Sequence, residues 1–382
     1  MSNPLVIIGT GQAGTTVARE FRKIDDSSPL VLITSDDGRI YSKPLLSNAL
    51  AMGKDAGSLA MMDASRFAEQ VGADVHAHTR VLSIEPAATK VHSDAGEFSY
   101  HSLVLAIGAN QIRVPRKGDA CDDILRVNSL MDYRVFRERL LTGGHVTILG
   151  AGLNGCEFDN DLLGSGFSVS LIDPADYPMS RFVPEEVGRD LLDALTSCGA
   201  DFHLGCTAQA VWRDGKEFRV ELDDATTLST GLVLSSIGLR PAVDLAENAG
   251  IEVGRGIRVD RFLRSSDPNV FAVGDCAEVD GLVLPFIMPI MHAGRALAKT
   301  LAGEETPVVY PAMPVTVKTP CLPLVSTPAV RGGTLAWRTE EVEGGKKFSG
   351  YDDADQLRAL TLTGDATKQA FALSRDMPSW LR

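Results

Sequence analysis

The stretch that decides the fold runs from Pro4 to Ile24 and reads PLVIIGTGQAGTTVAREFRKI. A short apolar run comes first, the glycine motif GTGQAG of residues 9–14 follows, and a helix-forming segment comes last. This order of strand, turn and helix is typical of a dinucleotide-binding fold. Gly9 would permit the tight turn, Gly11 would let the backbone approach a pyrophosphate, and Gly14 would let the helix pack on the strand. We therefore expect a phosphate-bearing ligand at the N-terminus of this helix.

A second copy of the same pattern begins at His145 and reads HVTILGAGLNGCEFDNDLLGSG. The next apolar run, residues 169–172, ends on Asp173, which lies 18 residues after the last glycine of the motif, Gly155. A carboxylate at this place accepts hydrogen bonds from the two ribose hydroxyls of NAD and repels the 2′-phosphate of NADP. In the first copy, Asp36 follows Gly14 by 22 residues. One such motif is a weak signal, but two complete copies predict two dinucleotide sites, of which the second prefers NAD(H).

Length and composition bound the remaining possibilities. A chain of 382 residues is long enough for more than one hydrophobic core. Hydrophobic residues make up 44% and charged residues 23%, which disfavours disordered, collagen-like and coiled-coil classes. The formal charge of -13 argues against general binding of nucleic acid or of anionic membranes, because both need a basic face. No apolar run approaches the roughly 18 to 20 residues that span a bilayer.

The N-terminus and the cysteines indicate the compartment. Residues 1–4, MSNP, lack the basic start of a secretory signal, so we expect a cytoplasmic protein without membrane insertion. The six cysteines contain no CxxC pair, and the first of them is Cys121. This spacing favours reduced, mostly buried thiols over a disulfide framework or a zinc site, and the seven histidines show no metal-ligand spacing either.

Further strand signals follow the two motifs. The apolar runs 102–108 and 232–238 each close on a glycine and are typical of chain crossings between domains. Residues 270–273 form a strand that ends in Gly274-Asp275, and an aspartate at a strand's carboxyl end can bind the sugar-like chain of a cofactor. Residues 289–302 predict a helix. From Val308 onward, prolines interrupt short β-rich runs, which predicts a small antiparallel domain with one helix near 368–374.

Four motifs occur in an order that resembles a known family. They are GTGQAG, the glycine-ended strand before Ala109, GAGLNGCE, and SSDPNVFAVGDCAE at 265–278. The chain thus resembles the FAD-dependent two-dinucleotide-binding-domain pyridine nucleotide oxidoreductases. Within that family, YSKPLLS at 41–47 and MPVTVKTP at 313–320 resemble bacterial rubredoxin-NAD reductases.

The resemblance implies an α/β fold. It would hold two Rossmann-like three-layer dinucleotide-binding domains of the glutathione-reductase type and a small α+β C-terminal domain. The implied domains are a discontinuous FAD-binding domain (1–109 and 235–307), an NAD(H)-binding domain (110–234) and a C-terminal domain (308–382).

The resemblance also implies residue roles, with Lys43 and Glu157 as catalytic residues. Lys43 and Pro44 match a basic-Pro pair beside the isoalloxazine ring, and Glu157 matches an acid near the point where nicotinamide meets flavin. Lys318 matches a lysine on the flavin's pyrimidine side, Asp275 the ribityl-binding acid, and Val81 a backbone contact to adenine. The expected FAD-binding residues are Gly9, Gly11, Gln12, Ala13, Gly14, Ser35, Asp36, Lys43, Pro44, Val81, Ala106, Gly108, Asp275 and Lys318; the expected NAD-binding residues are Gly150, Gly152, Asn154, Gly155, Glu157, Asp173 and Gly238.

Plainer interpretations stand beside these roles. Lys43 and Lys318 could be solvated lysines, Glu157 could be a polar residue early in a helix, and Asp173 could simply end a strand. The chain also departs from the family pattern at three positions. Asn154 replaces an apolar residue and Asp159 a small one, which puts the packing around the nicotinamide in doubt. Thr34 replaces the acid that ends the second strand in many members, so Ser35 and Asp36 would serve instead.

The activity implied is transfer of a hydride from NADH to FAD and of single electrons onward to rubredoxin or a similar one-electron iron protein. Such a reductase would supply, for example, an alkane hydroxylase or an oxygen- or nitric-oxide-scavenging pathway. Lys43 and the lack of any cysteine before Cys121 argue against disulfide reductases and peroxidase-type relatives. The alternatives left open are a reductase of a ferredoxin or flavorubredoxin, an NADH oxidase, and a non-enzymatic redox sensor that responds to NAD(H).

Overall fold

The first glycine motif opens a five-stranded parallel sheet. The computed structural model describes residues 3–113, 116–140, 144–330 and 333–382. The strand order is β20-β9-β1-β2-β5, so segments from both ends of the chain share one sheet. The strands are β1 (Leu5–Ile8), β2 (Leu30–Ile33), β5 (Asp74–His76), β9 (Ser102–Leu105) and β20 (Val270–Ala272). The residues of β1 and β20 are all buried and those of β2 and β9 all but one, as expected for a parallel sheet covered on both faces, whereas the edge strand β5 is partly exposed.

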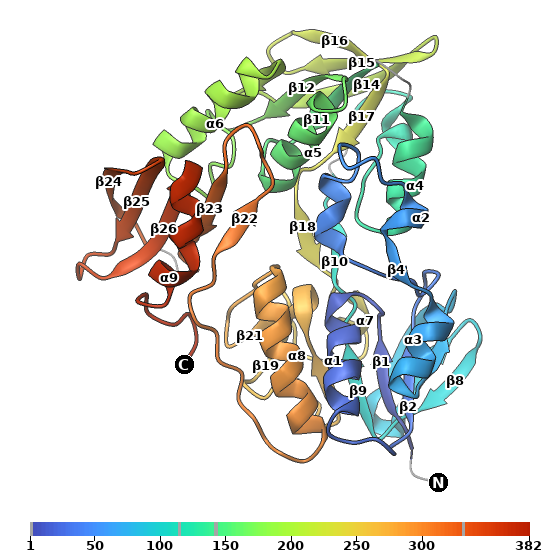
Figure 1. Cartoon of the computed structure of the whole chain (residues 1–382). Coiled ribbons are helices and arrows are strands. Elements are labelled where there is room, and N and C mark those ends of the chain that lie inside the picture. Colours follow the sequence, from blue (N-terminus) through green and yellow to red (C-terminus); the bar gives the residue numbers. More distant parts are fainter. Residues whose placement is uncertain (1–2, 114–115, 141–143, 331–332) are drawn as a thin grey trace.

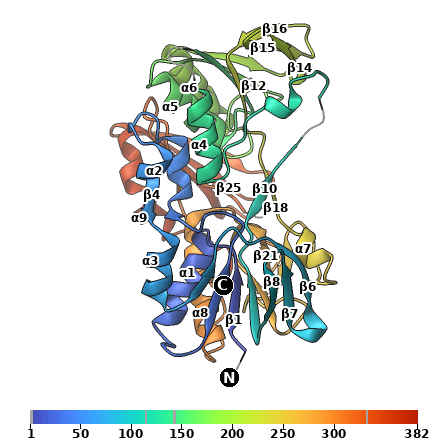
Figure 2. The ribbon, with the colours of Figure 1, turned by 90° about the vertical axis from the view of Figure 1, so that its right-hand side faces the viewer.

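The two faces of this sheet carry different layers. Helices α1 (Gln12–Arg22), α3 (Ala64–Val71) and α8 (Ile287–Leu301) cover one face, and the antiparallel strands β6 (Val81–Glu85), β7 (Lys90–Ser93) and β8 (Gly96–Ser99) cover the other (Figure 2). Helices α1 and α8 approach closely, since a Cβ added at Gly294 would lie 2.7 Å from Cγ2 of Thr16. This three-layer body contains the largest hydrophobic core.

The second glycine motif opens a four-stranded parallel sheet with the order β13-β12-β11-β17. Its strands are β11 (His145–Leu149), β12 (Ser168–Asp173), β13 (Ala200–Leu204) and β17 (Leu232–Ser235). One side of this sheet carries three helices, α4 (Leu130–Arg139), α5 (Leu153–Leu163) and α6 (Glu185–Ser197). The antiparallel strands β14 (Ala208–Asp214), β15 (Glu217–Leu222) and β16 (Thr227–Thr230) form the upper edge of Figure 1.

Two short strands join these bodies. Strand β10 (Ala109–Gln111) leaves the first body and β18 (Leu239–Pro241) returns to it, and the two pair antiparallel with Ala109 opposite Pro241 (Figure 1). Both follow the glycine-ended strands β9 and β17. The sequence had indicated chain crossings at these two places.

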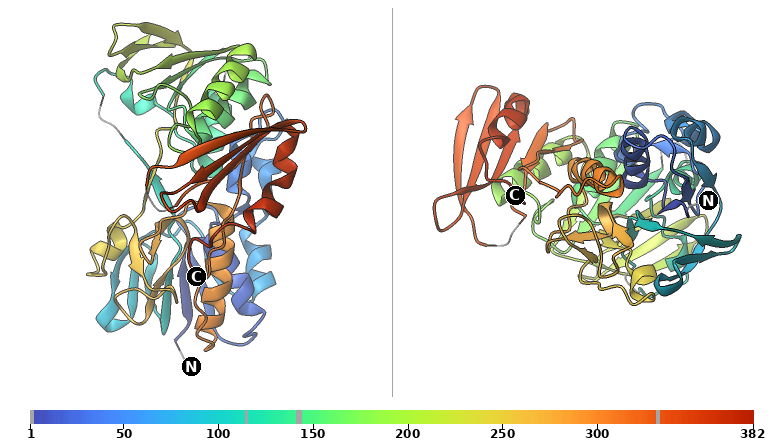
Figure 3. Two further views of the ribbon diagram at one scale, coloured as in Figure 1. Left: turned by 90° about the vertical axis from the view of Figure 1, so that its left-hand side faces the viewer. Right: turned by 90° about the horizontal axis from the view of Figure 1, so that it is seen from below.

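The C-terminal region is an antiparallel sheet of order β22-β23-β26-β25-β24 with one short helix. The elements are β22 (Val315–Val317), β23 (Leu324–Thr327), β24 (Ala336–Val342), β25 (Gly345–Tyr351), β26 (Leu357–Thr363), η5 (Gly364–Gln369) and α9 (Ala370–Ser374). It projects to one side of the other two bodies (Figure 3, right). Lys346 Nζ contacts Asp190 Oδ2 of α6 at 2.9 Å, and Thr339 Oγ1 donates to Glu186 Oε2 at 3.1 Å.

The remaining elements are short. They are β3 (Ile40–Tyr41), η1 (Lys43–Ser47), α2 (Ala56–Leu59), β4 (Ala60–Met62), η2 (Pro86–Ala88), η3 (Cys121–Asp123), α7 (Asp244–Glu247), β19 (Ile257–Val259), η4 (Gly274–Cys276) and β21 (Ala277–Val279). None of the helices in the described part of the chain has the length and apolar character that crossing a bilayer requires. The architecture confirms the predicted fold class, two Rossmann-like three-layer bodies and a small α+β domain.

Candidate functional site

The first glycine turn is built so that only its middle glycine faces open space. Gly9 has φ +109°, and a Cβ there would lie 2.3 Å from the carbonyl oxygen of Ala106. A Cβ at Gly14 would lie 2.0 Å from the carbonyl oxygen of Gly9, so strand and helix touch at this point. A Cβ at Gly11, the residue before α1, would meet nothing within 4 Å. The turn therefore leaves a free approach to the N-terminal amides of α1, where Gln12 and Ala13 begin the helix.

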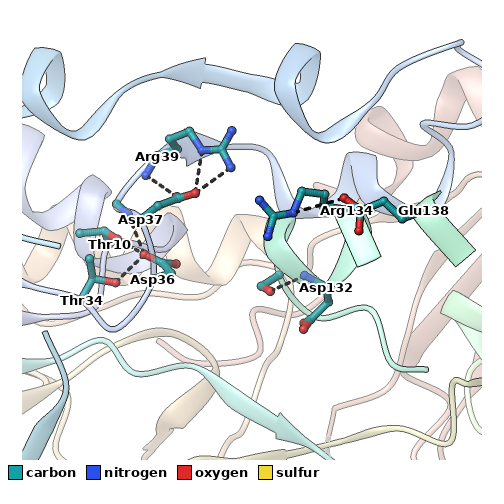
Figure 4. Close-up of polar contacts among 10 residues, drawn as sticks. Thr10, Thr34, Asp36, Asp37, Arg39, Asp132, Arg134 and Glu138 are labelled. Atoms are coloured by element: carbon teal, nitrogen blue, oxygen red, sulfur yellow. Dashed lines mark hydrogen bonds and ion pairs between the residues drawn. The ribbon is translucent and has the colours of Figure 1, made fainter. Parts of the chain in front are cut away.

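The carboxylate of Asp36 is fixed at the end of β2. Its Oδ1 accepts hydrogen bonds from Thr34 Oγ1 at 2.7 Å, from Gly38 N at 2.9 Å and from Thr10 Oγ1 at 3.4 Å. Figure 4 shows Thr10 and Thr34 converging on Asp36 beside the neighbouring pair of Asp37 and Arg39. All three bonds use Oδ1, so Oδ2 stays available for a hydroxyl-bearing ligand.

Asp275 is the second acid of this body and lies in η4, directly after β20. Its Oδ1 is buried and has no hydrogen-bond partner within the described residues. Burial raises the pKa of Asp275, and the positive charge of Lys43 opposes that rise. Burial lowers the pKa of Lys43, against the attraction of Asp275 and of Asp132 on α4. Asp132 is labelled at the lower right of Figure 4. A buried acceptor without a donor fits a ligand that brings a hydroxyl group.

The second glycine turn repeats the construction of the first. Gly150 has φ +103°, and its Cβ would lie 2.6 Å from the carbonyl oxygen of Ser236, while a Cβ at Gly155 would lie 1.9 Å from the carbonyl oxygen of Gly150. A Cβ at Gly152 would meet nothing within 4 Å. Asp173 ends β12 and binds this turn, because its Oδ2 accepts from Ala151 N at 2.7 Å. Its Oδ1 accepts from Ala175 N at 2.9 Å.

A pocket lies where the crossing strands meet the second turn. Asn154, Phe158, Gln111, Ile237 and Gly238 line it. Gly238 has φ +111°, in the region that favours glycine, and sits directly before β18. The pocket therefore connects the second glycine turn with the passage between the two bodies.

Glu157 stands at the junction of all three bodies. Its side chain is fully buried on α5. Oε2 accepts a hydrogen bond from Ser47 Oγ of η1 at 2.5 Å and forms an ion pair with Lys318 Nζ, while Oε1 accepts from Lys318 N at 3.0 Å. Because the ammonium, the hydroxyl and the amide converge on one carboxylate, the buried charge is matched. In the structure, the Lys318 ammonium is therefore bound by the Glu157 carboxylate.

Two further residues of α5 bind the same neighbouring segments. Asp161 accepts from Leu50 N at 3.0 Å and from Ala51 N at 2.8 Å, just after η1, and Asn160 Oδ1 accepts from Cys321 N at 3.2 Å, just after β22. The sequence analysis missed Ser47, Asn160 and Asp161 as junction residues. The spacing of Glu157 and Asp161, one helical turn apart, was the available signal.

Asp159 is an unmatched acid on the same helix. It is fully buried, and neither carboxylate oxygen has a hydrogen-bond partner in the described part of the chain. Burial raises the pKa of this carboxyl to about 8. The departure that the sequence showed at this position is thus a buried carboxyl that stays protonated at neutral pH.

The other predicted site residues lie around the first turn. Gly108 has φ +70° with open space at its Cβ position, and the carbonyl of Ala106 faces Gly9. Ser35 is exposed in the turn before Asp36. Val81 begins β6, two residues after Thr79, whose amide donates to the carbonyl of Thr34 at 2.8 Å. Pro44 is in η1 between Lys43 and Ser47. These residues gather at the carboxyl edge of the first sheet, the edge at which α/β folds bind ligands.

The two turns and their acids fit dinucleotides. Gly11 and Gly152 leave the helix N-termini approachable, Asp36 and Asp173 stand at the ends of the next strands, and Asp275 offers an unmatched acceptor. The first body would hold the flavin dinucleotide, and the second would hold the nicotinamide dinucleotide.

Comparison with known families supports both the dinucleotide-binding part of the chain and its C-terminal part. Residues 3–300 match the family described as pyridine nucleotide-disulphide oxidoreductase. Residues 307–377 match the family described as rubredoxin binding C-terminal domain. The first match covers both glycine motifs and Asp275, and the second covers Lys318.

Individual relatives are similar along nearly the whole chain. A protein of Alcanivorax borkumensis named rubredoxin-NAD(+) reductase is 43% identical over 379 residues, with 99% of each chain covered. A protein of Aeromonas hydrophila named nitric oxide reductase FlRd-NAD(+) reductase is 38% identical, over 99% of this chain and 97% of the relative. Among solved structures, the ferredoxin reductase for the CYP199A2 system from Rhodopseudomonas palustris superposes with a TM-score of 0.88. That pair shares 27% identity, over 99% of this chain and 96% of the other.

Proposed function

The chain belongs to the pyridine nucleotide-disulphide oxidoreductase family, and we propose that it takes electrons from NADH and passes them singly to rubredoxin or a similar one-electron iron protein. The family assignment confirms the resemblance inferred from the motifs. Relatives in this family use FAD and NAD(H), the two predicted cofactors. When bound, FAD supplies the step between a two-electron donor and a one-electron acceptor.

One observation carries the proposal: Lys318 and Ser47 meet on Glu157. Lys318 comes from the region that matches a rubredoxin-binding domain, Ser47 from η1, which begins at the predicted flavin-site residue Lys43, and Glu157 from the helix that follows the second glycine turn. We therefore propose that the segments that bind rubredoxin, FAD and NADH are held together by one buried carboxylate.

The chain's own residues would do the following. Gly11 and Gly152 leave room for the two pyrophosphates, and Asp36 and Asp173 accept hydrogen bonds from ribose hydroxyls. Asp275 accepts from a hydroxyl of the flavin dinucleotide, and Lys43 adds a positive charge beside it. Glu157 holds the Lys318 ammonium and orients the β22 end of the C-terminal domain. The predicted site residues, the domain boundaries 1–109 with 235–307, 110–234 and 308–382, and the cytoplasmic location are parts of this proposal.

A flavorubredoxin is the second candidate acceptor, favoured by the similarity to the nitric oxide reductase FlRd-NAD(+) reductase of Aeromonas hydrophila. Stopped-flow mixing of the FAD-loaded protein with NADH, followed by each carrier in turn, separates the candidates. Fast bleaching of the flavin absorbance and then rapid reduction of rubredoxin is the expected result. If no carrier speeds reoxidation beyond the rate with oxygen alone, the electron-carrier role is wrong and an oxidase is the better assignment.

A further inference from the structure

A segment of the predicted FAD-binding domain packs in the core of the second body. It runs from residue 43 to residue 59, contains η1 and α2, and begins with the predicted flavin-site residues Lys43 and Pro44. Its buried apolar side chains belong to the core formed by α4, α5, α6 and the second sheet, whereas the first sheet has a separate core. These side chains are Leu46, Ala49, Ala56 and Leu59. The predicted NAD(H)-binding domain therefore supports the segment that starts at the flavin site.

Asp161 of α5 binds the middle of this segment with both carboxylate oxygens. Its Oδ2 accepts a hydrogen bond from Leu50 N at 3.0 Å, and its Oδ1 accepts one from Ala51 N at 2.8 Å. The carboxylate is buried, so no more than a trace of solvent competes for these two amides. The roles proposed above use Glu157 on the same helix but leave Asp161 without one. Two charge-assisted bonds to consecutive amides fix both the position and the direction of the backbone at this point.

The backbone between these amides and Lys43 is hydrogen-bonded. Leu45 N donates to the carbonyl of Ser42 at 3.0 Å, and Asn48 N donates to the carbonyl of Leu45 at 3.3 Å. The first amide that α5 binds lies two residues beyond Asn48. A shift of the anchored amides would therefore be passed along η1 to Lys43.

We propose that Asp161 is a positioning residue for Lys43 and that it sets, from the NAD(H)-binding domain, where the Lys43 ammonium stands in the flavin site. The inference rests on the proposed function, in which Lys43 supplies a positive charge at the FAD site. A positive charge near the ring stabilises the negative charge that the ring gains on reduction. Asp161 therefore raises the midpoint potential of the bound flavin, and it does so through Lys43.

A double-mutant cycle on the FAD-loaded protein tests this route. The midpoint potential of the flavin is measured by equilibration with a redox dye in the wild type, Asp161→Asn, Lys43→Met and the double variant. Lys43→Met should make the potential more negative, because the positive charge is lost. Asp161→Asn exchanges one acceptor oxygen for an NH₂ group, so one amide loses its partner, and the potential should shift in the same direction by less. In the Lys43→Met background, Asp161→Asn should add no further shift.

Two results of this cycle would overturn the proposal. One is an unchanged potential in Asp161→Asn with Lys43 present, and the other is the same shift in both backgrounds. If Asp161→Asn does not fold, Tyr133→Phe takes its place in the cycle, with the same results deciding. The Tyr133 hydroxyl of α4 donates to the carbonyl of Lys54 on the same segment at 3.1 Å, and phenylalanine keeps the ring in the core.

Asp260→Asn is the matched control. The Asp260 carboxylate also accepts from two backbone amides, Phe262 N at 2.8 Å and Arg264 N at 3.0 Å, but in an exposed loop after β19. This variant should leave the potential unchanged, and a shift as large as that of Asp161→Asn would contradict the proposal. A wild type that takes up no FAD would overturn the proposed function and this inference together. A wild type that binds FAD and is bleached by NADH, with a potential independent of Asp161, would overturn this inference alone.

Discussion

Glu157 binds both the backbone amide and the side-chain ammonium of Lys318, 161 positions further along the chain. The carboxylate is fully buried, whereas the Lys318 side chain keeps 23% of its exposure. A buried charge with its partner removed is far more costly than a matched pair. The junction of the three domains thus depends on electrostatic matching as well as on apolar packing.

Loss of the Lys318 ammonium should destabilise the junction more than loss of both charges. Lys318→Met leaves Glu157 buried without its counterion, which should cost about 3–5 kcal/mol of unfolding free energy. The double variant Lys318→Met/Glu157→Gln should recover most of that loss. Urea unfolding of the flavin-loaded proteins checks this. Equal stability of the single and double variants would show that the pair is not energetically coupled.

The glycines of the second turn should separate folding from binding. Gly152→Ala adds a methyl group to open space, so the fold should remain while NADH affinity falls at least tenfold, because the ligand loses its approach to α5. Gly155→Ala places a carbon 1.9 Å from the Gly150 carbonyl oxygen and should lower the melting temperature clearly. Thermal unfolding and NADH titration distinguish them. An unchanged NADH affinity in Gly152→Ala would move the nucleotide away from this turn.

Substitution of Asp173 should change nucleotide selectivity. Asp173→Ala removes the predicted ribose acceptor and the bond to Ala151 N, so KM for NADH should rise several-fold and discrimination against NADPH should weaken. Asp173→Asn keeps an acceptor for one amide but removes the repulsive charge, and it should relax selectivity with less loss of structure. Steady-state kinetics with both nucleotides measure this. Unchanged selectivity in both variants would remove Asp173 from the ribose site.

Asp159 should make stability fall as pH rises. Its folded pKa of about 8 lies above the ordinary 3.8, so between these values the folded state holds a proton that the unfolded state has released. Stability from the neutral carboxyl is therefore complete below about pH 4 and is lost progressively up to about pH 8. Asp159→Asn should gain stability relative to the wild type across this window, by several kcal/mol in order of magnitude.

Asp352 gives a control of opposite sign. Its hydrogen bond with Arg358 lowers the pKa of that carboxyl, so the wild type loses this contribution as pH falls below the ordinary Asp value. As pH rises from strongly acidic values, the free energy of unfolding of Asp352→Asn should therefore fall relative to that of the wild type. Urea unfolding from about pH 2 to about pH 9 covers both the Asp352 control and the Asp159 effect. A flat difference between Asp159→Asn and wild type would mean that the carboxyl is solvated or ionised in the fold.

The glycine motifs predicted the local geometry well, because strand, turn and helix follow from steric limits within about twenty residues. Gly9, Gly14, Gly150 and Gly155 stand at the contacts that such a motif needs. The apolar runs 102–108 and 232–238 likewise predicted the crossings that became β10 and β18.

The junction could not be predicted in the same way. Ser47 reaches Glu157 across 110 positions and Cys321 reaches Asn160 across 161, so no local pattern pairs them. The sequence marked Asp159 as unusual, but only the packed structure shows that its carboxyl is buried and accepts no hydrogen bond from any described residue. Long-range contacts depend on how the domains dock, and the periodicity of one segment does not contain that information.

The role of α5 as a shared support limits how this enzyme can be recombined. A chimera that takes its C-terminal domain from a relative would bring new residues to the positions of Lys318 and Cys321, while Glu157 and Asn160 stayed behind on α5. Such a chimera would leave the Glu157 carboxylate buried without a counterion unless the new domain carried a cation at the position of Lys318. The C-terminal domain looks separable along the chain, but it has to be exchanged together with helix α5.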